Sequence, residues 1–207
     1  MMPKLCCLLL LSALLSTGLS GCVDIPPTHY YTFQPNMWTS SASAPFRYAV
    51  VIGIEPFDAE PSYQQDRIIF RTSPYEVNFY EYHRWLVLPT DLVTDQVYRL
   101  FAASDLFQHV HTYGFEAYAD YILQGKIAMF DQWYHGDETS STIRIGIYYR
   151  FITTEDEQVL WMDSIETTTD VHSVEMVETV KGFESALHAN IQDALEAIDT
   201  VLAPQQE

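Results

Sequence analysis

Cysteine is scarce in this sequence, and the region long enough to fold has none. Of the three cysteines, Cys6 and Cys7 lie in an apolar N-terminal segment and Cys22 follows it. From Val23 to Glu207 there is no thiol. This excludes a disulfide framework, a thiolate metal site and a cysteine nucleophile from that region. The fold there must be held by its hydrophobic core alone.

Basic residues are also few. The chain has 10 Lys and Arg against 28 Asp and Glu. Lys4 is the one basic residue of the apolar N-terminal segment, so the rest of the chain has nine basic residues and a net charge of about −19. Such a surface repels phosphate-rich partners and anionic headgroups. We therefore expect no nucleic-acid partner and no membrane attachment through a basic patch. The same charge could serve solubility alone.

Motifs for catalysis are absent as well. There is no Gly-x-Ser-x-Gly elbow, no His-Glu-x-x-His and no Gly-rich phosphate loop. His109 and His111 alternate on a predicted strand and suggest a metal pair, with His135 or Asp131 as a third ligand. Zinc needs three or four convergent ligands, and no spacing here fixes the third. We favour ordinary surface histidines, and expect neither a metal nor a cofactor.

The many carboxylates supply no clear catalytic pair. Asp163 and Glu166 lie near the end of a predicted strand, and Glu155–Glu157 form a predicted turn. Neither group has a recognisable partner geometry, so solvated charge is the favoured interpretation. No Ser or Thr nucleophile stands out. The sequence therefore favours a protein that is not an enzyme, with an anchored hydrolase as a weaker alternative.

The N-terminus has the pattern of an export signal. Lys4 supplies a positive charge, Leu5–Leu15 is an apolar run, and Leu19–Cys22 reads Leu-Ser-Gly-Cys. The run is too short for a spanning helix, which needs ~20 residues. Leu-Ser-Gly-Cys resembles the lipobox of bacterial lipoproteins. The resemblance implies a signal peptide at residues 1–21 and acylation of Cys22, including palmitate. The alternative is an ordinary secretory signal with a chance cysteine.

After the signal, two regions follow. Residues 22–45 are expected to hold the lipidated cysteine, a tether with Pro26-Pro27 and a first short strand at Tyr30–Phe33. The eight residues from Cys22 to His29 reach ~25–30 Å at most, which keeps the domain near the bilayer. Pro35–Pro45 reads as a loop. Residues 46–207 form the predicted folded domain.

Periodicity predicts the fold class of that domain. Period-2 runs joined by polar turns favour an antiparallel meander, and two amphipathic stretches favour helices. Thr90 and Ser173 are the expected N-caps of the two helices. Strands are predicted at 46–54, 67–72, 75–82, 106–113, 119–133, 143–151 and 159–169, and helices at 90–104 and 175–202. The result is an α+β fold, a mainly antiparallel sheet with two principal helices packed on one face.

One segment combines arginines with aromatic residues. Arg67, Arg71, Arg84 and Trp85 are candidate binding residues, because arginine and aromatic side chains anchor interfaces. The alternative is that the arginines pair only with local acids such as Glu76, while Trp85 packs beneath the first helix.

Five motifs in order resemble the ABC-type transport auxiliary lipoprotein family, the PqiC-like lipoproteins. They are Leu19–Cys22, Tyr30–Phe33, Val51–Pro56, the Asp66–Ser73 stretch with Asp-Arg and a later Arg-Thr-Ser, and Glu81–Trp85 with its Arg-Trp end. The sequence departs from the family pattern at Phe33, where Leu is usual, and at Leu86–Leu88, where a more acidic stretch is usual.

This resemblance implies a lipid-transport role without catalysis. The expected partners are an MCE-domain protein and the ABC transporter subunits of the same system, with a homo-oligomer possible. Val23 follows the lipidated cysteine, whereas Asp at that position signals retention at the inner membrane in enterobacteria. We therefore expect the outer membrane, facing the periplasm. The alternative is a general envelope-assembly or stress lipoprotein that binds proteins without transporting lipid.

Overall fold

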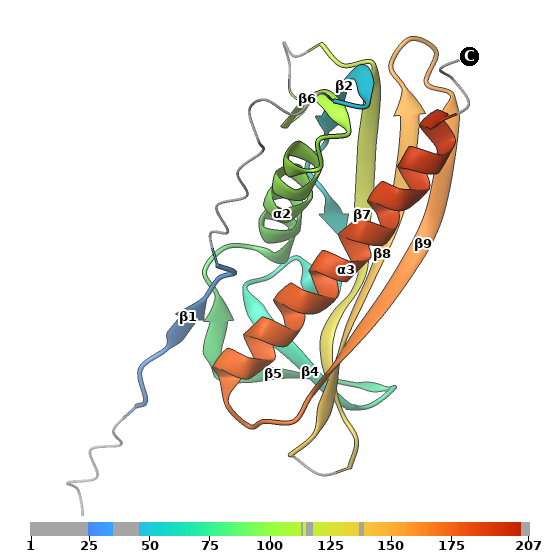
Figure 1. The fold of residues 1–207 in the computed structure, drawn as a ribbon. Coiled ribbons are helices and arrows are strands. Elements are labelled where there is room, and N and C mark those ends of the chain that lie inside the picture. The colour runs from blue at the N-terminus through green and yellow to red at the C-terminus, as the bar shows by residue number, and fades with distance from the viewer. Residues whose placement is uncertain (1–24, 35–45, 113, 115–117, 137–138, 204–207) are drawn as a thin grey trace, which may run out of the picture.

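A computed structural model describes residues 25–34, 46–112, 114, 118–136 and 139–203. The predicted signal peptide, the predicted acylation site Cys22 and the loop predicted at Pro35–Pro45 lie outside the described residues. Within them, nine strands form one curled mixed sheet, and two long helices cover it (Figure 1). No helix in the described ranges is long and apolar enough to cross a membrane.

The longest strands lie in the second half of the chain, before the last helix. The elements in chain order are β1 (His29–Tyr31), β2 (Tyr48–Ile54), β3 (Asp58–Ala59), the 3₁₀ turn η1 (Pro61–Tyr63), β4 (Arg67–Ser73), β5 (Glu76–Trp85), α2 (Pro89–Ala103), β6 (Phe107–Thr112), β7 (Tyr121–Tyr134), β8 (Ser141–Thr153), β9 (Val159–Val171) and α3 (Met176–Leu202).

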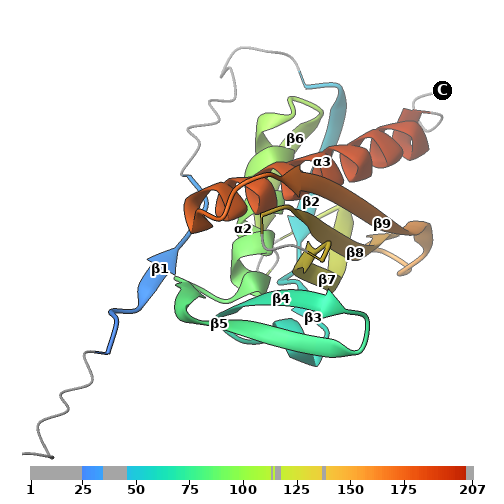
Figure 2. The ribbon, with the colours of Figure 1, turned by 90° about the horizontal axis from the view of Figure 1, so that it is seen from below.

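Strand β7 is the centre of the sheet. One edge pairs with β8 in antiparallel fashion along nearly the whole strand. The other edge takes β2, β3 and β4 in parallel, one after another along its length. Strand β9 extends the antiparallel part beyond β8, while β5, β1 and β6 complete the other side. Figure 2 shows the resulting curl, with the β4–β5 hairpin on one side and α3 with β9 on the other.

The predicted α+β class is confirmed, and the pairing within the sheet is more varied than expected. The antiparallel meander is correct for β7, β8 and β9. However, β2, β3 and β4 run parallel to β7, β1 runs parallel to β5, and β6 runs parallel to β2. Parallel pairs join strands distant in sequence, as the β2–β6 pair does across α2. The sheet is therefore mixed.

The core lies between the sheet and the two helices. Strand β8 turns one apolar row inward, and α3 turns its stripe toward that row, as the sequence predicts. Helix α3 packs on β8 and β9, α2 packs on β2 and β6, and the helices contact each other. In Figure 1 both lie in front of the strands. The inward rows are Ile143, Ile145, Ile147, Tyr149 and Phe151 of β8, and Val180, Phe183, Leu187, Ile191, Ala194, Ile198 and Leu202 of α3.

The predicted helix starts were wrong by one or two residues. Helix α2 has Leu88 as its N-cap and Pro89 as its first residue, so Thr90 is already inside the helix. Proline suits the first helical position because its fixed φ matches the helix and its missing N–H needs no acceptor. Helix α3 has Glu175 as its N-cap, and the Ser173 hydroxyl accepts the backbone N–H of Glu175 at 3.1 Å.

A close approach across the sheet requires glycine at position 125. The ring of Phe57, in the connection between β2 and β3, occupies the space where a Cβ on Gly125 would lie, with 2.1 Å between that Cβ and the nearest ring atom. Phe57 cannot easily withdraw, because it is buried and packs edge-on against the ring of Tyr149. The contact fixes this connection over β7.

We expect Gly125→Ala to lower the free energy of unfolding by about 1–3 kcal/mol, because the added methyl overpacks a filled core. Denaturant unfolding followed by circular dichroism measures this. Gly114→Ala is the matched control: no atom lies within 4 Å of its Cβ, so its effect should stay within about 0.5 kcal/mol. Equal effects of the two substitutions would contradict this account.

Candidate functional site

Two of the predicted binding residues meet in a row across three strands, in which Tyr30 and Arg67 are exposed and Arg84 is half-buried. Arg84 of β5 lies opposite Tyr30 of β1 on one side and Arg67 of β4 on the other. Arg84 pairs with Asp66 at 2.8 Å, and the Arg67 guanidinium lies 5.2 Å from the ring centre of Phe79. Direct cross-strand partners lie about 5 Å apart on one face. We name Tyr30, Arg84 and Arg67 the arginine row.

Arg71 lies elsewhere, in a buried ion network around Asp131. The Asp131 carboxylate is fully buried. Its Oδ2 accepts Nε–H of Arg71 at 2.7 Å and the Tyr63 hydroxyl at 2.9 Å. Its Oδ1 accepts Nε–H and Nη2–H of Arg144 at 2.9 and 2.8 Å. Burial, and next the nearby Asp131 charge, raise the pKa of the Tyr63 hydroxyl.

This network corrects the expected local pairing of Arg71, which pairs with Asp131, 60 residues away in sequence, whereas the sequence suggested local acids such as Glu76. Arg84 does pair within the segment, with Asp66. Two guanidinium groups hold one carboxylate, so Asp131 has no acceptor position left over for a metal. The network ties β4, β7 and β8 together.

Trp85 lies inside the core. It is 1% exposed, and the rings of Phe33, Phe130 and Phe183 surround it at centroid distances of 5.2–5.7 Å. Phe183 belongs to α3, so Trp85 packs against the last helix, whereas the alternative offered for Trp85 was packing beneath the first helix. Binding by the four candidate residues remains a prediction, and Trp85 would contribute to it by supporting β5.

We expect Trp85→Ala to lower the free energy of unfolding by about 3–5 kcal/mol, since it removes a buried indole and leaves a cavity. Denaturant unfolding measures this. Leu86→Ala, at the exposed next position, is the control and should change stability by about 0.5 kcal/mol or less. A fully stable Trp85→Ala protein would show that this packing does not hold in solution.

Two stacked histidines join β1 to β5 behind the arginine row. His29 and His83 are register partners, with ring centroids 5.6 Å apart. The Tyr31 hydroxyl lies 2.8 Å from Nδ1 of His83, and the Tyr80 ring meets His83 edge-on. Burial, and then the neighbouring His29, lower the pKa of His83. The neutral histidine is therefore the form that suits the folded chain.

This lowered pKa predicts a pH effect of definite sign. The folded chain resists protonation of His83, and the unfolded chain does not. Stability from this site is present above about pH 6.5 and is lost as pH falls through that value toward the lowered pKa. His83→Gln should make the fall in the denaturant midpoint between about pH 7.5 and pH 5 shallower. His172→Gln, at an exposed position, should leave it unchanged; an equal change would refute the link.

The histidines proposed as metal ligands have other neighbours. In His111, Nε2 lies 2.8 Å from the Tyr118 carbonyl oxygen and Nδ1 lies 3.1 Å from that of Thr112. The His135 ring lies 2.6 Å from the Thr142 hydroxyl. Across the described residues, no three or more His, Asp or Glu side chains converge on a metal position. Asp163 and Glu166 are exposed on β9.

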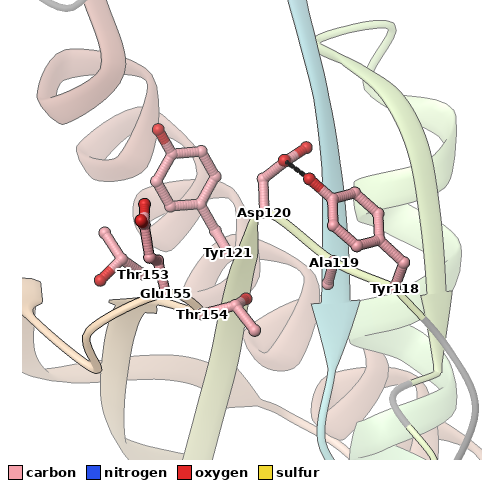
Figure 3. Close-up of a pocket in the computed structure, with 7 residues that line it drawn as sticks. All are labelled: Tyr118, Ala119, Asp120, Tyr121, Thr153, Thr154 and Glu155. Carbon is pink, nitrogen blue, oxygen red and sulfur yellow. Dashed lines mark hydrogen bonds between the residues drawn. The ribbon is translucent and has the colours of Figure 1, made fainter.

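A pocket of about 430 Å³ opens beside the start of β7 (Figure 3). The Asp120 carboxylate is its central polar group. It accepts the Tyr118 hydroxyl at 2.5 Å and the backbone N–H of Val51 at 2.8 Å, so both oxygens have partners. The lining holds neither His nor Ser, and so lacks the set of groups that a hydrolase of the Ser-His-Asp type needs. The lining residues are Tyr118, Ala119, Asp120, Tyr121, Thr153, Thr154 and Glu155.

Sequence reasoning passed over one exposed apolar segment. Leu86, Val87 and Leu88 form the connection from β5 to α2, and all three are exposed. In the sequence, Leu86–Leu88 is marked only by its departure from the family pattern, in which a more acidic stretch is usual. Three successive apolar residues between a strand and a helix-starting proline are a signal that could have located this surface.

Comparison with known proteins identifies the family. Residues 31–198 match the family described as the ABC-type transport auxiliary lipoprotein component. This chain belongs to that family. The expected resemblance is therefore confirmed, and the chain is an auxiliary lipoprotein component of ABC-type transport, a class associated with membranes. No curated protein sequence matches the chain.

Solved structures support the fold of this family member. A protein from Xanthomonas campestris has a TM-score of 0.69 at 22% identity, covering 86% of this chain and 98% of its own. A protein described as uncharacterized has a TM-score of 0.61 at 10% identity, covering 84% and 99%. A hypothetical protein from Chlamydia trachomatis has a TM-score of 0.50 at 9% identity, covering 75% and 99%.

Proposed function

We propose that this auxiliary lipoprotein is a non-catalytic adaptor in an ABC/MCE-type system that transports phospholipid across the envelope. Acyl chains on Cys22 hold it at the outer membrane, where it faces the periplasm. The observation that carries the proposal is the family match over residues 31–198, preceded by the lipobox at Leu19–Cys22. The ATP chemistry belongs to another subunit.

The features of the described residues favour an adaptor over an enzyme. The pocket beside β7 has its one aspartate engaged by two donors. The buried Asp131 is engaged by two arginines and a tyrosine. The arginine row, by contrast, lies at the surface. In it Arg84 lies beside Tyr30, and Arg67 lies beside Phe79. Side chains of these types concentrate binding energy at protein interfaces.

We therefore assign the MCE-domain partner to the arginine row. A partner of opposite charge would gain affinity from Arg67 and Arg84, and would be steered toward this row because the chain as a whole is acidic. Arg71 and Trp85 serve the site indirectly, since one fixes β4 to β7 and the other holds the end of β5 in the core.

Purification of the tagged full chain from detergent-solubilised membranes tests this function. We expect the MCE-domain protein and the ABC transporter subunits to be recovered with it. The double substitution Arg67→Glu with Arg84→Glu should reduce recovery of the MCE-domain protein by about tenfold or more, the range for interface charges. Arg99→Glu is the matched control, because Arg99 forms an ordinary exposed ion pair with Asp95 on α2.

The anchor is tested in the same cells. Cys22→Ser should abolish palmitate incorporation and release the chain from the membrane fraction. If the wild-type chain recovers no ABC or MCE component, and neighbouring genes encode none, the transport assignment is wrong. Retained protein partners without an effect of deletion on lipid asymmetry would instead favour the general envelope-assembly role.

A further inference from the structure

The connection from β5 to α2 exposes an unusual amount of apolar surface. Leu86 is 61% exposed, and Val87 and Leu88 are each 41% exposed. Pro89 behind them is buried as the first residue of α2, so the backbone of this connection is held from both ends. We name Leu86–Leu88 the apolar tip. Three neighbouring apolar side chains held in water cost free energy that contact with an apolar phase would recover.

The apolar tip lies beside the strand that leads to the lipid anchor. The backbone N–H of Leu86 donates to the Tyr31 carbonyl at 2.8 Å, which joins the tip to the end of β1. Figures 1 and 2 agree in placing β1 and the β5–α2 connection on the same side of the molecule. The chain from Cys22 to His29 reaches about 25–30 Å at most. An acylated Cys22 therefore brings the tip within reach of the bilayer.

The charges next to the tip suit a bilayer surface. Arg84 directly precedes Trp85 and the tip, and Arg67 lies opposite Arg84. Asp66 pairs with Arg84, and Asp91 in the first turn of α2 is the exposed acid nearest the tip in sequence. Elsewhere the chain is strongly acidic, with 28 acidic residues against 10 basic ones. The arginines beside the tip offset this acidity locally, so the tip can reach the headgroup boundary while the arginine row stays available to the partner.

We propose that the apolar tip is a second membrane contact that inserts into the bilayer to which Cys22 is anchored. The contact rests on the lipid anchor of the proposed function and adds an orientation to it. Three side chains are too few to hold a free domain on a membrane, but tethering makes their binding intramolecular, at a high effective concentration. Docking of the tip then fixes which surfaces of the domain face the periplasm.

Depth measurement on the lipidated chain tests this proposal. The mature region has no thiol other than the acylated one, so Val87→Cys provides a single site for an environment-sensitive fluorophore. Met162→Cys on β9, at 69% exposure, is the matched control at another exposed apolar position. Both proteins are reconstituted into vesicles of phosphatidylethanolamine and phosphatidylglycerol that contain no partner protein. Flotation first selects the anchored chains.

We expect the label at position 87 to be shifted to the blue, quenched by brominated acyl chains, and several-fold less accessible to iodide than the label at 162. Adding Leu86→Ser and Leu88→Ser to Val87→Cys should return the label to water without releasing the chain.

Equal iodide accessibility at 87 and 162 on floated vesicles would overturn the membrane contact alone. Shielding of 87 only after the MCE-domain partner is added would overturn it too, and assign the tip to that protein. A chain that does not float would refute both the anchor and this contact.

Discussion

The hydrogen-bonding capacity of strand β7 is the constraint on which the rest of the structure depends. Its backbone groups at both edges need partners, since unpaired peptide groups in a buried strand are costly. β8 satisfies one edge, and three separate segments, β2, β3 and β4, share the other. Within the described residues, β2, β3 and β4 are thereby aligned directly against it. The positions of the arginine row and the apolar tip follow from that alignment, because β5 and β1 attach through β4.

The buried ion network reinforces the same junction. Asp131 on β7 binds Arg71 from β4 and Arg144 from β8, so one carboxylate links the two edges of the central strand. A buried carboxylate is tolerable only when its oxygens are fully paired, and here four donors surround it. The arrangement specifies where β4 must end against β7, which positions the hairpin that carries Arg67 and Arg84.

The parts of the fold that the sequence predicted correctly are those governed by local periodicity. The alternation from Ile143 to Phe151 and the stripe along α3 each place many residues on one face, so their burial was correctly expected. Parallel pairing leaves no comparable local signal. Strand β3 has two residues, Asp58 and Ala59, too short for any pattern to identify.

The candidate site was predictable to a similar extent. Arg67 and Arg84 were selected by residue type, and their meeting across β4 and β5 required only the hairpin. The partner of Arg71 was not predictable, because it lies on a strand that becomes a neighbour only through tertiary pairing. Trp85 was ambiguous for another reason: an indole at the end of a strand suits both a core and an interface. The apolar tip had a sequence signal, the three apolar residues before Pro89, but only the structure shows that all three side chains are exposed.

Acidic residues on strand β9 have a consequence for self-association of the sheet. Within the described residues β8 is the only strand partner of β9, so the other edge of β9 has no strand against it. An open edge of that length is a template for self-association through new backbone hydrogen bonds. Asp163, Glu166 and Asp170 are spaced along it and exposed. A second copy approaching edge to edge would bring like charges together. The carboxylates therefore disfavour edge-to-edge association of the sheet.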